Sequence, residues 1–373
     1  MKRFIPFIVL FLAVFSSMPA VYSQQMKGSV KPGTITFPRG IININKYLAH
    51  LPRGTAEKKL TPHKDRTVWN SWYFCISPVP DGKTFVMSRF TDEAWMLSYD
   101  IENDVFGKVF ERPAKGNSDI VYHVASPKDY DKCYGAFASS EVCEYSIATG
   151  RILRRVNTKG KPYRLLPSRN GEKLYISGLP QVWDLKTNRI TLLGDYETDC
   201  FALDSKDNQL AVGVRDKGAI MLYNAGSRKP PRTIPVTGKN VGSMRFVNDD
   251  KFLLVGTADP ATISLISLSS NKPVFTVHGF ESDRIADLFC NSDGLLLFVV
   301  QTKGSETVPA FAFDTKTMLP VCMFDGNHHM ENAALTPDEK RLILPTIVSF
   351  TVSEIPDRTE IDATVGKLKA LNH

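Results

Sequence analysis

Short apolar runs separated by polar turns fill this chain from about residue 67 to residue 357. Gln181–Tyr196, QVWDLKTNRITLLGDY, shows the pattern: an apolar pair is closed by Asp184, a polar turn follows at 186–189, and a second apolar run covers Ile190–Leu193. Branched and aromatic residues on both sides of a polar turn predict two antiparallel strands.

This hairpin pattern recurs along the chain. Further copies begin at Trp95, Val142, Ile220, Ile263 and Pro309. The residues that correspond to Asp184 in these copies are Asp100, Ser146, Asn224, Ser267 and Asp314. Successive members are separated by about 38 to 47 residues, which is the period of the blades of a β-propeller.

A second pattern precedes each hairpin: an apolar strand, a hinge residue, a turn and another apolar strand. Its seven hinges are Ser77, Ser126, Pro167, Asp204, Val247, Asn291 and Thr336, about 43 residues apart on average. Each repeat therefore supplies four short strands, and a single such sheet buries its faces only by stacking on its neighbours around an axis. The sequence predicts an all-β fold, a seven-bladed β-propeller of four-stranded antiparallel blades.

The repeats resemble the WD-repeat β-propeller family over roughly residues 67–357. Trp183-Asp184 matches the signature pair, whereas the other copies replace it, as in Tyr99-Asp100 and Phe313-Asp314. The Gly-His dipeptide of the family is missing, so its hydrogen-bond network is not carried over. Exported bacterial propellers of the YVTN type are equally similar. Either resemblance implies a scaffold role.

The N-terminus has the pattern of a secretory signal peptide, residues 1–23. Lys2 and Arg3 precede an apolar run, Phe4–Phe15, and small residues allow cleavage after Ser23. This run is shorter than the roughly 20 residues that span a bilayer, so no transmembrane segment is expected after cleavage. The chain contains no Asn-x-Ser/Thr sequon, which favours a bacterial protein, secreted or periplasmic.

Residues 24–66 form an N-terminal extension, and residues 358–373 are expected to be a C-terminal tail. The seventh repeat supplies only three strands, Asn332–Leu335, Arg341–Leu344 and Val348–Val352. An incomplete last blade leaves an open sheet edge. We therefore expect residues 34–45 to complete it, with Thr359–Thr364 as the alternative donor.

The formal net charge of +7 is dispersed along the chain, and without a continuous basic stripe a nucleic-acid partner is not expected. Six cysteines lack CxxC spacing. Cys133 and Cys143 fall on adjacent strands and are the one disulfide candidate, whereas Cys75, Cys200 and Cys290 are expected to be buried thiols. No cofactor is indicated. A metal site is not indicated either, because the adjacent His328 and His329 point opposite ways on an extended chain and cannot easily share one ion.

The predicted innermost strands contain the candidate ligand-binding residues. Three residues before each hinge the side chains are Phe74, His123, Arg164, Phe201, Met244, Leu288 and Ala333. One residue earlier they are Tyr73, Tyr122, Tyr163, Cys200, Ser243, Asp287 and Asn332. We predict a pocket in which Arg164 binds a carboxylate or phosphate, His123 donates or accepts a proton, and Tyr73, Tyr122 and Tyr163 form the walls. The alternative is that these side chains lock neighbouring blades together.

No GxSxG, HExxH, Walker or dinucleotide-binding motif occurs in the chain. The leading interpretation is an exported, monomeric, non-catalytic propeller that binds a protein or a small ligand on one face of the ring. The alternative is a propeller hydrolase or lactonase that acts at the central channel through Tyr122, His123, Tyr163 and Arg164.

Overall fold

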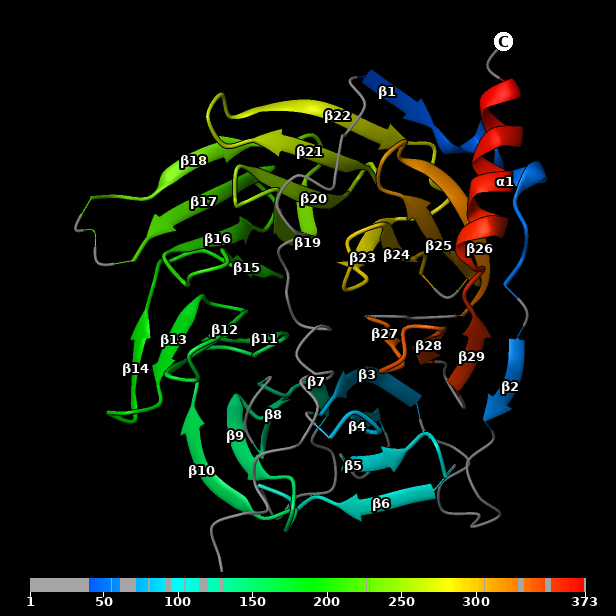
Figure 1. Cartoon of the computed structure of the whole chain (residues 1–373). Coiled ribbons are helices and arrows are strands. Elements are labelled where there is room, and N and C mark those ends of the chain that lie inside the picture. Colours follow the sequence, from blue (N-terminus) through cyan, green and yellow to red (C-terminus); the bar gives the residue numbers. More distant parts are fainter. Residues whose placement is uncertain are drawn as a thin grey trace, which may run out of the picture.

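The computed structural model describes residues 40–54, 56–60, 72–79, 81–90, 95–103, 105–113, 120–127, 131–225, 227, 229–304, 306–327, 332–345 and 350–371. Strands make up most of this part of the chain, and Figure 1 shows their sheets standing side by side in a ring. The predicted signal peptide, residues 1–23, lies outside the described residues.

Within the described residues, four sheets each contain four consecutive, antiparallel strands. The strands of the first two are β3 (Trp72–Pro78), β4 (Thr84–Phe90), β5 (Trp95–Asp100), β6 (Val105–Val109), β7 (Val121–Ala125), β8 (Lys132–Phe137), β9 (Glu141–Ser146) and β10 (Ile152–Asn157). Those of the next two are β11 (Leu165–Pro167), β12 (Lys173–Ile176), β13 (Gln181–Asp184), β14 (Arg189–Leu192), β15 (Phe201–Leu203), β16 (Gln209–Val214), β17 (Ala219–Asn224) and β18 (Arg232–Pro235).

A nine-stranded sheet follows, with β1 at one end. Its strands are β19 (Asn240–Val247), β20 (Phe252–Ala258), β21 (Ile263–Ser267), β22 (Lys272–His278), β23 (Arg284–Cys290), β24 (Leu296–Thr302), β25 (Val308–Asp314), β26 (Leu319–Asn327) and, parallel to β22, β1 (Gly40–Asn43). Its two halves are joined through one residue pair, Ala258 of β20 and Arg284 of β23.

The hairpin repeats have a common structural basis in the turn between the third and fourth strands. The Asp184 carboxylate accepts hydrogen bonds from the backbone N–H groups of Lys186 and Thr187, at 3.0 and 2.7 Å. Asp100 accepts two equivalent bonds at 3.0 Å, and Asp314 accepts one from Thr317 at 3.0 Å. The recurring aspartate therefore closes the turn by satisfying backbone donors, which is the usual role of Asp in an Asx-turn.

The core consists of apolar layers between neighbouring sheets. Trp183 on β13 is fully buried and meets Tyr134 of the preceding sheet edge to face, with ring centroids 6.4 Å apart. Its indole N–H donates to Asn188 at 3.0 Å, so its one polar atom is satisfied. The Arg154 guanidinium lies 5.6 Å from the centre of the Trp183 ring, a distance at which cation–π attraction adds to the packing.

The N-terminal extension completes the last sheet, but with a different strand from the one expected. This sheet contains β27 (Ala334–Leu335), β28 (Arg341–Pro345), β29 (Phe350–Glu354) and β2 (Ala56–Leu60), which pairs antiparallel with β29 at the outer edge. The prediction that residues 34–45 supply this strand is therefore wrong in position. Within that range Gly40–Asn43 form β1, which extends a different sheet. Figure 1 shows β2 beside β29 and β1 beside β22.

The C-terminal segment is a helix and not a tail. Helix α1 (Arg358–Ala370) begins with a capping box, in which Asp357 accepts from the Glu360 backbone N–H at 2.9 Å and Glu360 accepts from that of Asp357 at 2.9 Å. Its buried face packs beside β26 (Figure 1). Residues Thr359–Thr364, the alternative donor of the closing strand, are thus helical.

Candidate functional site

A cavity of about 550 Å³ lies on the axis of the ring, between the innermost strands of all the sheets. It is lined by residues of β3, β7, β11, β15, β19, β23 and β27 or of the positions next to them. This volume is typical of small-molecule sites, which are clefts of roughly 300 to 1,000 Å³. The predicted innermost strands are therefore the ones that surround the central cavity.

One structurally equivalent position recurs around the cavity. In β3, β7, β19 and β23 it directly follows a β-bulge and carries Cys75, His123, Ser243 and Asp287. In the other three sheets this position lies just before the inner strand and carries Arg164, Cys200 and Asn332. Each lies four residues before the residue whose backbone N–H closes the next turn, which is Ser168, Asp204 or Thr336 respectively. This position therefore carries polar or thiol side chains around the ring.

The sequence alignment had a different register in the later repeats. It placed His123 and Arg164 with Met244 and Leu288, but those two side chains are fully buried between sheets. Ser243 and Asp287, one residue earlier, are the true equivalents. The error arises because the hinges of the second and third repeats, Ser126 and Pro167, lie three residues after the inward-facing position, whereas those of the later repeats lie four residues after it.

Arg164 extends across the cavity and joins sheets on opposite sides of it. Its Nη1 donates to the Gly242 carbonyl at 2.8 Å and its Nη2 to the Ala286 carbonyl at 2.7 Å. Gly242 and Ala286 are the extra residues of the bulges in β19 and β23, and a bulge leaves such a residue outside the strand ladder. Both Nη atoms of Arg164 thus satisfy protein carbonyls, which supports the blade-locking interpretation of this side chain.

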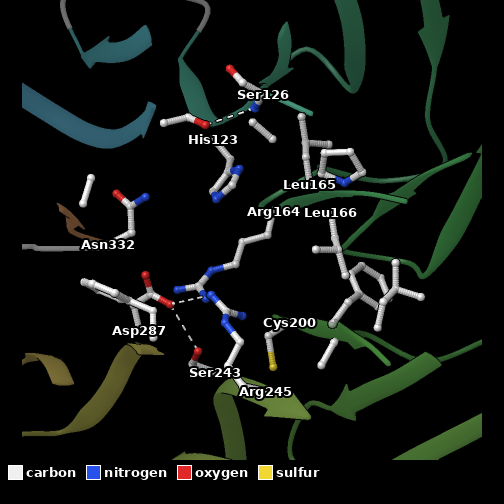
Figure 2. A pocket seen from close by; sticks show the side chains of 18 of the residues that line it. His123, Ser126, Arg164, Leu165, Leu166, Cys200, Ser243, Arg245, Asp287 and Asn332 are labelled. Atoms are coloured by element: carbon white, nitrogen blue, oxygen red, sulfur yellow. Dashed lines mark hydrogen bonds and ion pairs between the residues drawn. The ribbon is translucent and has the colours of Figure 1, made fainter. Parts of the chain in front are cut away.

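Arg245, Asp287 and Ser243 form a second polar group in the cavity. Asp287 Oδ1 accepts from Ser243 Oγ at 3.2 Å, from Arg245 Nη2 at 3.3 Å and from the Leu288 backbone N–H at 2.9 Å. Arg245 Nη1 donates to the Met244 carbonyl at 2.9 Å. Figure 2 shows the Arg164 side chain reaching toward Arg245 and Asp287. Ser243 and Asp287 stood in the second column of the sequence pattern but not among the predicted ligand-binding residues, and Arg245 stood in neither column.

His123 lies next to these charges without a hydrogen bond at Nδ1, which is buried and has no partner among the described residues. Removal from water, and then the positive charges of Arg164 and Arg245, lower the pKa of His123 to about 3. The imidazole is therefore neutral at physiological pH. A base with so low a pKa is poorly matched to proton transfer near neutral pH.

The lowered pKa of His123 predicts a specific loss of stability in acid. The unfolded chain binds a proton at this residue below its ordinary pKa of 6.5, whereas the folded chain does so only near pH 3. The free energy of unfolding is therefore expected to fall as the pH decreases between these values, by up to about 1.4 kcal/mol per pH unit. Urea unfolding at pH 7.0, 6.0 and 5.0 measures the slope, which His123→Gln should reduce. The same change at the exposed His50 should leave it unchanged, and equal slopes in all three proteins would contradict the prediction.

Asn332 links the last sheet to the first. Its side-chain oxygen accepts from the Ile76 N–H at 3.0 Å, and its amide nitrogen donates to the Ile76 carbonyl at 2.7 Å. The ring is thus closed twice, by Asn332 beside the cavity and by β2 at the outer edge.

Tyr122 and Tyr163 lie outside the residues that line the cavity. Their rings pack against each other, with centroids 5.2 Å apart, and the Arg215 guanidinium lies 5.1 Å from the centre of the Tyr163 ring. Arg215 is held by ion pairs with Glu197 and Asp199. These five residues lie at one end of the inner strands, which we call the loop face. The opposite end carries turns such as residues 248–251, and we call it the turn face. The side chain of Tyr73 lies outside the described structure.

The predicted disulfide is not formed. Cys133 and Cys143 are both thiols, and the strand register pairs Cys133 with Tyr145 and Cys143 with Gly135. Cys75, Cys133, Cys143 and Cys200 are all buried. Burial raises the pKa of Cys200 and of Cys290, which also borders the cavity, to about 12, so both thiols stay protonated at neutral pH.

The described residues contain no group of three or more His, Cys, Asp and Glu side chains placed to hold a metal ion. His328 and His329 are outside that part of the chain. A search of the described helices finds none with the length and apolar character needed to cross a membrane.

No family model matches the sequence, and no curated protein matches it. Among solved structures, a chain from the crystal structure of a mitotic checkpoint complex is similar, with a TM-score of 0.66 and 14% sequence identity. The match covers 83% of this chain and 94% of the other. At this identity the likeness concerns the fold alone. Together with the ring of sheets, it supports an all-β propeller with four-stranded antiparallel blades.

Proposed function

We propose that this chain is an exported, monomeric, non-catalytic propeller scaffold that binds a protein on its loop face. One observation carries the proposal: Tyr122, Tyr163 and Arg215 form a preassembled, half-buried cluster. Tyr and Arg are enriched among the residues that contribute most to protein–protein affinity. Because Glu197 and Asp199 already hold Arg215 in place, a partner would meet a surface that loses little side-chain freedom on binding.

We further propose that the ring has seven blades. The nine-stranded sheet divides naturally at its single Ala258–Arg284 pair into β19–β22, with β1 added, and β23–β26. These two units and the five four-stranded sheets together make seven.

The chemistry of the cavity supports binding over catalysis. His123 has a pKa of about 3, and the Cys200 and Cys290 thiols have pKa values of about 12. General-base catalysis near neutral pH needs an imidazole with a pKa close to that pH, and nucleophilic catalysis by cysteine needs a thiolate. His123, Cys200 and Cys290 supply neither. The hydrolase alternative therefore has no support from these side chains.

Two further observations support parts of the proposal. The basic and apolar pattern of residues 1–23 supports export through a cleaved signal peptide. The similar solved chain comes from a multi-protein assembly, the mitotic checkpoint complex, which is in keeping with protein binding by this architecture. Fold alone does not determine function, so the proposal depends on the loop-face cluster.

The test is site-specific photo-crosslinking in the natural host. A photoreactive residue replaces Lys217, which is exposed in the turn that contains Arg215, or Lys251, which is exposed on the turn face. We expect a discrete protein adduct from position 217 in the envelope or secreted fraction, on a chain that begins at Gln24. Adding Tyr163→Ala should reduce this adduct at least tenfold. An identical adduct from position 251, or one unaffected by Tyr163→Ala, would overturn the assignment to the loop face.

A further inference from the structure

The central cavity has an uneven chemical lining. Arg164, Arg245, Asp287 and His123 gather in one part of it, as Figure 2 shows. Elsewhere the lining is mainly apolar, with Leu166, Phe201, Ala202, Val247, Phe289 and Ala334, and it also includes Arg169, Asn332 and several serines. A site with a few polar groups beside apolar walls is the usual design for a small organic molecule that has one charged group.

Arg245 has hydrogen-bond donors to spare. A guanidinium carries five N–H groups, and among the described residues Arg245 uses one for the Met244 carbonyl and one for Asp287, the latter at 3.3 Å. The Asp287 oxygen that it contacts also accepts from Ser243 Oγ and from a backbone N–H. About 33% of the Arg245 side chain is exposed. Its remaining donors are therefore accessible to a ligand.

The surroundings of Arg245 favour an anion of low charge. Both Arg164 and Arg245 lower the pKa of His123, so their positive charge is effective at that side of the cavity. The buried Nδ1 of His123 adds a polar atom without a partner. Asp287, by contrast, would repel a doubly charged phosphate. A planar carboxylate fits the fork of a guanidinium and carries a single charge.

We propose that the central cavity binds a small organic carboxylate, whose carboxylate accepts hydrogen bonds from Arg245 and whose apolar body packs against Leu166, Phe201 and Phe289. This site is separate from the loop-face cluster, because Tyr122, Tyr163 and Arg215 do not line the cavity. The inference therefore goes beyond protein binding and does not depend on it.

Calorimetric titration of the full mature chain with 2-naphthoate tests the proposal, with 2-naphthalenemethanol as a neutral molecule of nearly the same shape. We expect saturable one-to-one binding of the carboxylate and at least tenfold weaker binding of the alcohol. Arg245→Gln should weaken naphthoate binding at least tenfold. Arg155→Gln, on the outer strand β10, should not change it, because its side chain is 62% exposed and is not among the residues that line the cavity.

A second readout does not depend on any variant being folded. Bound naphthoate places an aromatic ring and a negative charge near His123, so the NMR resonances of the His123 ring protons should shift at pH 7 as naphthoate is added, and the shift should saturate with the calorimetric affinity. Equal affinities for acid and alcohol, no saturable binding, or unchanged His123 resonances at saturation would each overturn the proposal. Tyr163→Ala is expected to retain naphthoate binding. Loss of protein binding at the loop face can therefore be distinguished from loss of carboxylate binding in the cavity.

Discussion

Replacing Arg164 with methionine is expected to lower the free energy of unfolding by about 3 kcal/mol or more. The substitution removes both hydrogen bonds that cross the cavity, to the carbonyls of Gly242 and Ala286. Leaving one buried acceptor without a partner costs roughly 1 to 3 kcal/mol, and two are affected here. Chemical denaturation monitored by tryptophan fluorescence and by far-UV circular dichroism measures the change.

Two further variants make this prediction specific. Arg164→Lys keeps the charge but replaces the fork with a single ammonium group, so we expect an intermediate loss. Arg53→Met removes an arginine whose side chain is 73% exposed and whose ion pair with Asp325 is 3.8 Å long; its effect should stay within about 0.5 kcal/mol. If Arg164→Met were no more destabilising than Arg53→Met, the cross-cavity bonds would not stabilise the ring.

Disrupting β2 is the second change with a large expected effect. Lys58 and Lys59 pair with Val352 and Thr351 of β29, and proline cannot donate to a strand ladder. The double substitution Lys58→Pro/Lys59→Pro should therefore detach the outer strand of the last sheet. We expect a loss of at least about 3 kcal/mol in the free energy of unfolding, combining lost ladder bonds with proline misfit. Aggregation should also increase, because the edge of β29 becomes available to other chains.

The matched control is Ile41→Pro in β1. Like β2, this strand comes from the N-terminal extension and lies at a sheet edge, but it is added to four strands that are already paired. Its loss should cost less and should not promote aggregation to the same degree. Thermal unfolding and light scattering of both variants compare the two strands. Equal effects would show that β2 has no special role in closing the ring.

The repeat architecture could be predicted because its signals are local. Asp100, Asp184 and Asp314 recur with the blade period since each closes the same turn through its own carboxylate. Trp183 could be assigned to a buried strand because an apolar pair precedes the turn. Such features depend only on residues within a few positions of one another, and a single sequence contains them in full.

The terminal segments were harder to predict, for two different reasons. The closing strand, Ala56–Leu60 (AEKKL), is rich in charged residues that are depleted in strands; lysine is, however, common on edge strands, where it discourages further pairing. Helix α1, by contrast, had a readable signal. Asp357 and Glu360 have the spacing of a capping box, and the sequence analysis did not use it.

The candidate site was predicted in part. His123 and Arg164 stood out as polar residues in an otherwise apolar column, and both line the cavity. Ser243 and Asp287 were assigned to the neighbouring column, because their hinges lie four residues after the inward-facing position, whereas those of His123 and Arg164 lie three residues after it. Arg245, two residues beyond Ser243 on the same strand, was in neither column. The offset between hinge and inward-facing position has no marker in a single sequence, so the inward-facing set requires the three-dimensional structure.

The contact between Asn332 and Ile76 joins residues that are 256 positions apart. Contacts of such high sequence separation carry a large loop-closure cost and slow the folding of β-rich proteins. Until β27 to β29 have been synthesised, the first sheet has no neighbour on one side, whereas the intermediate sheets can already stack on each other. We therefore expect ring closure to be a late step of folding. If the chain is exported unfolded, as the proposed function implies, it would complete its ring only on the far side of the membrane.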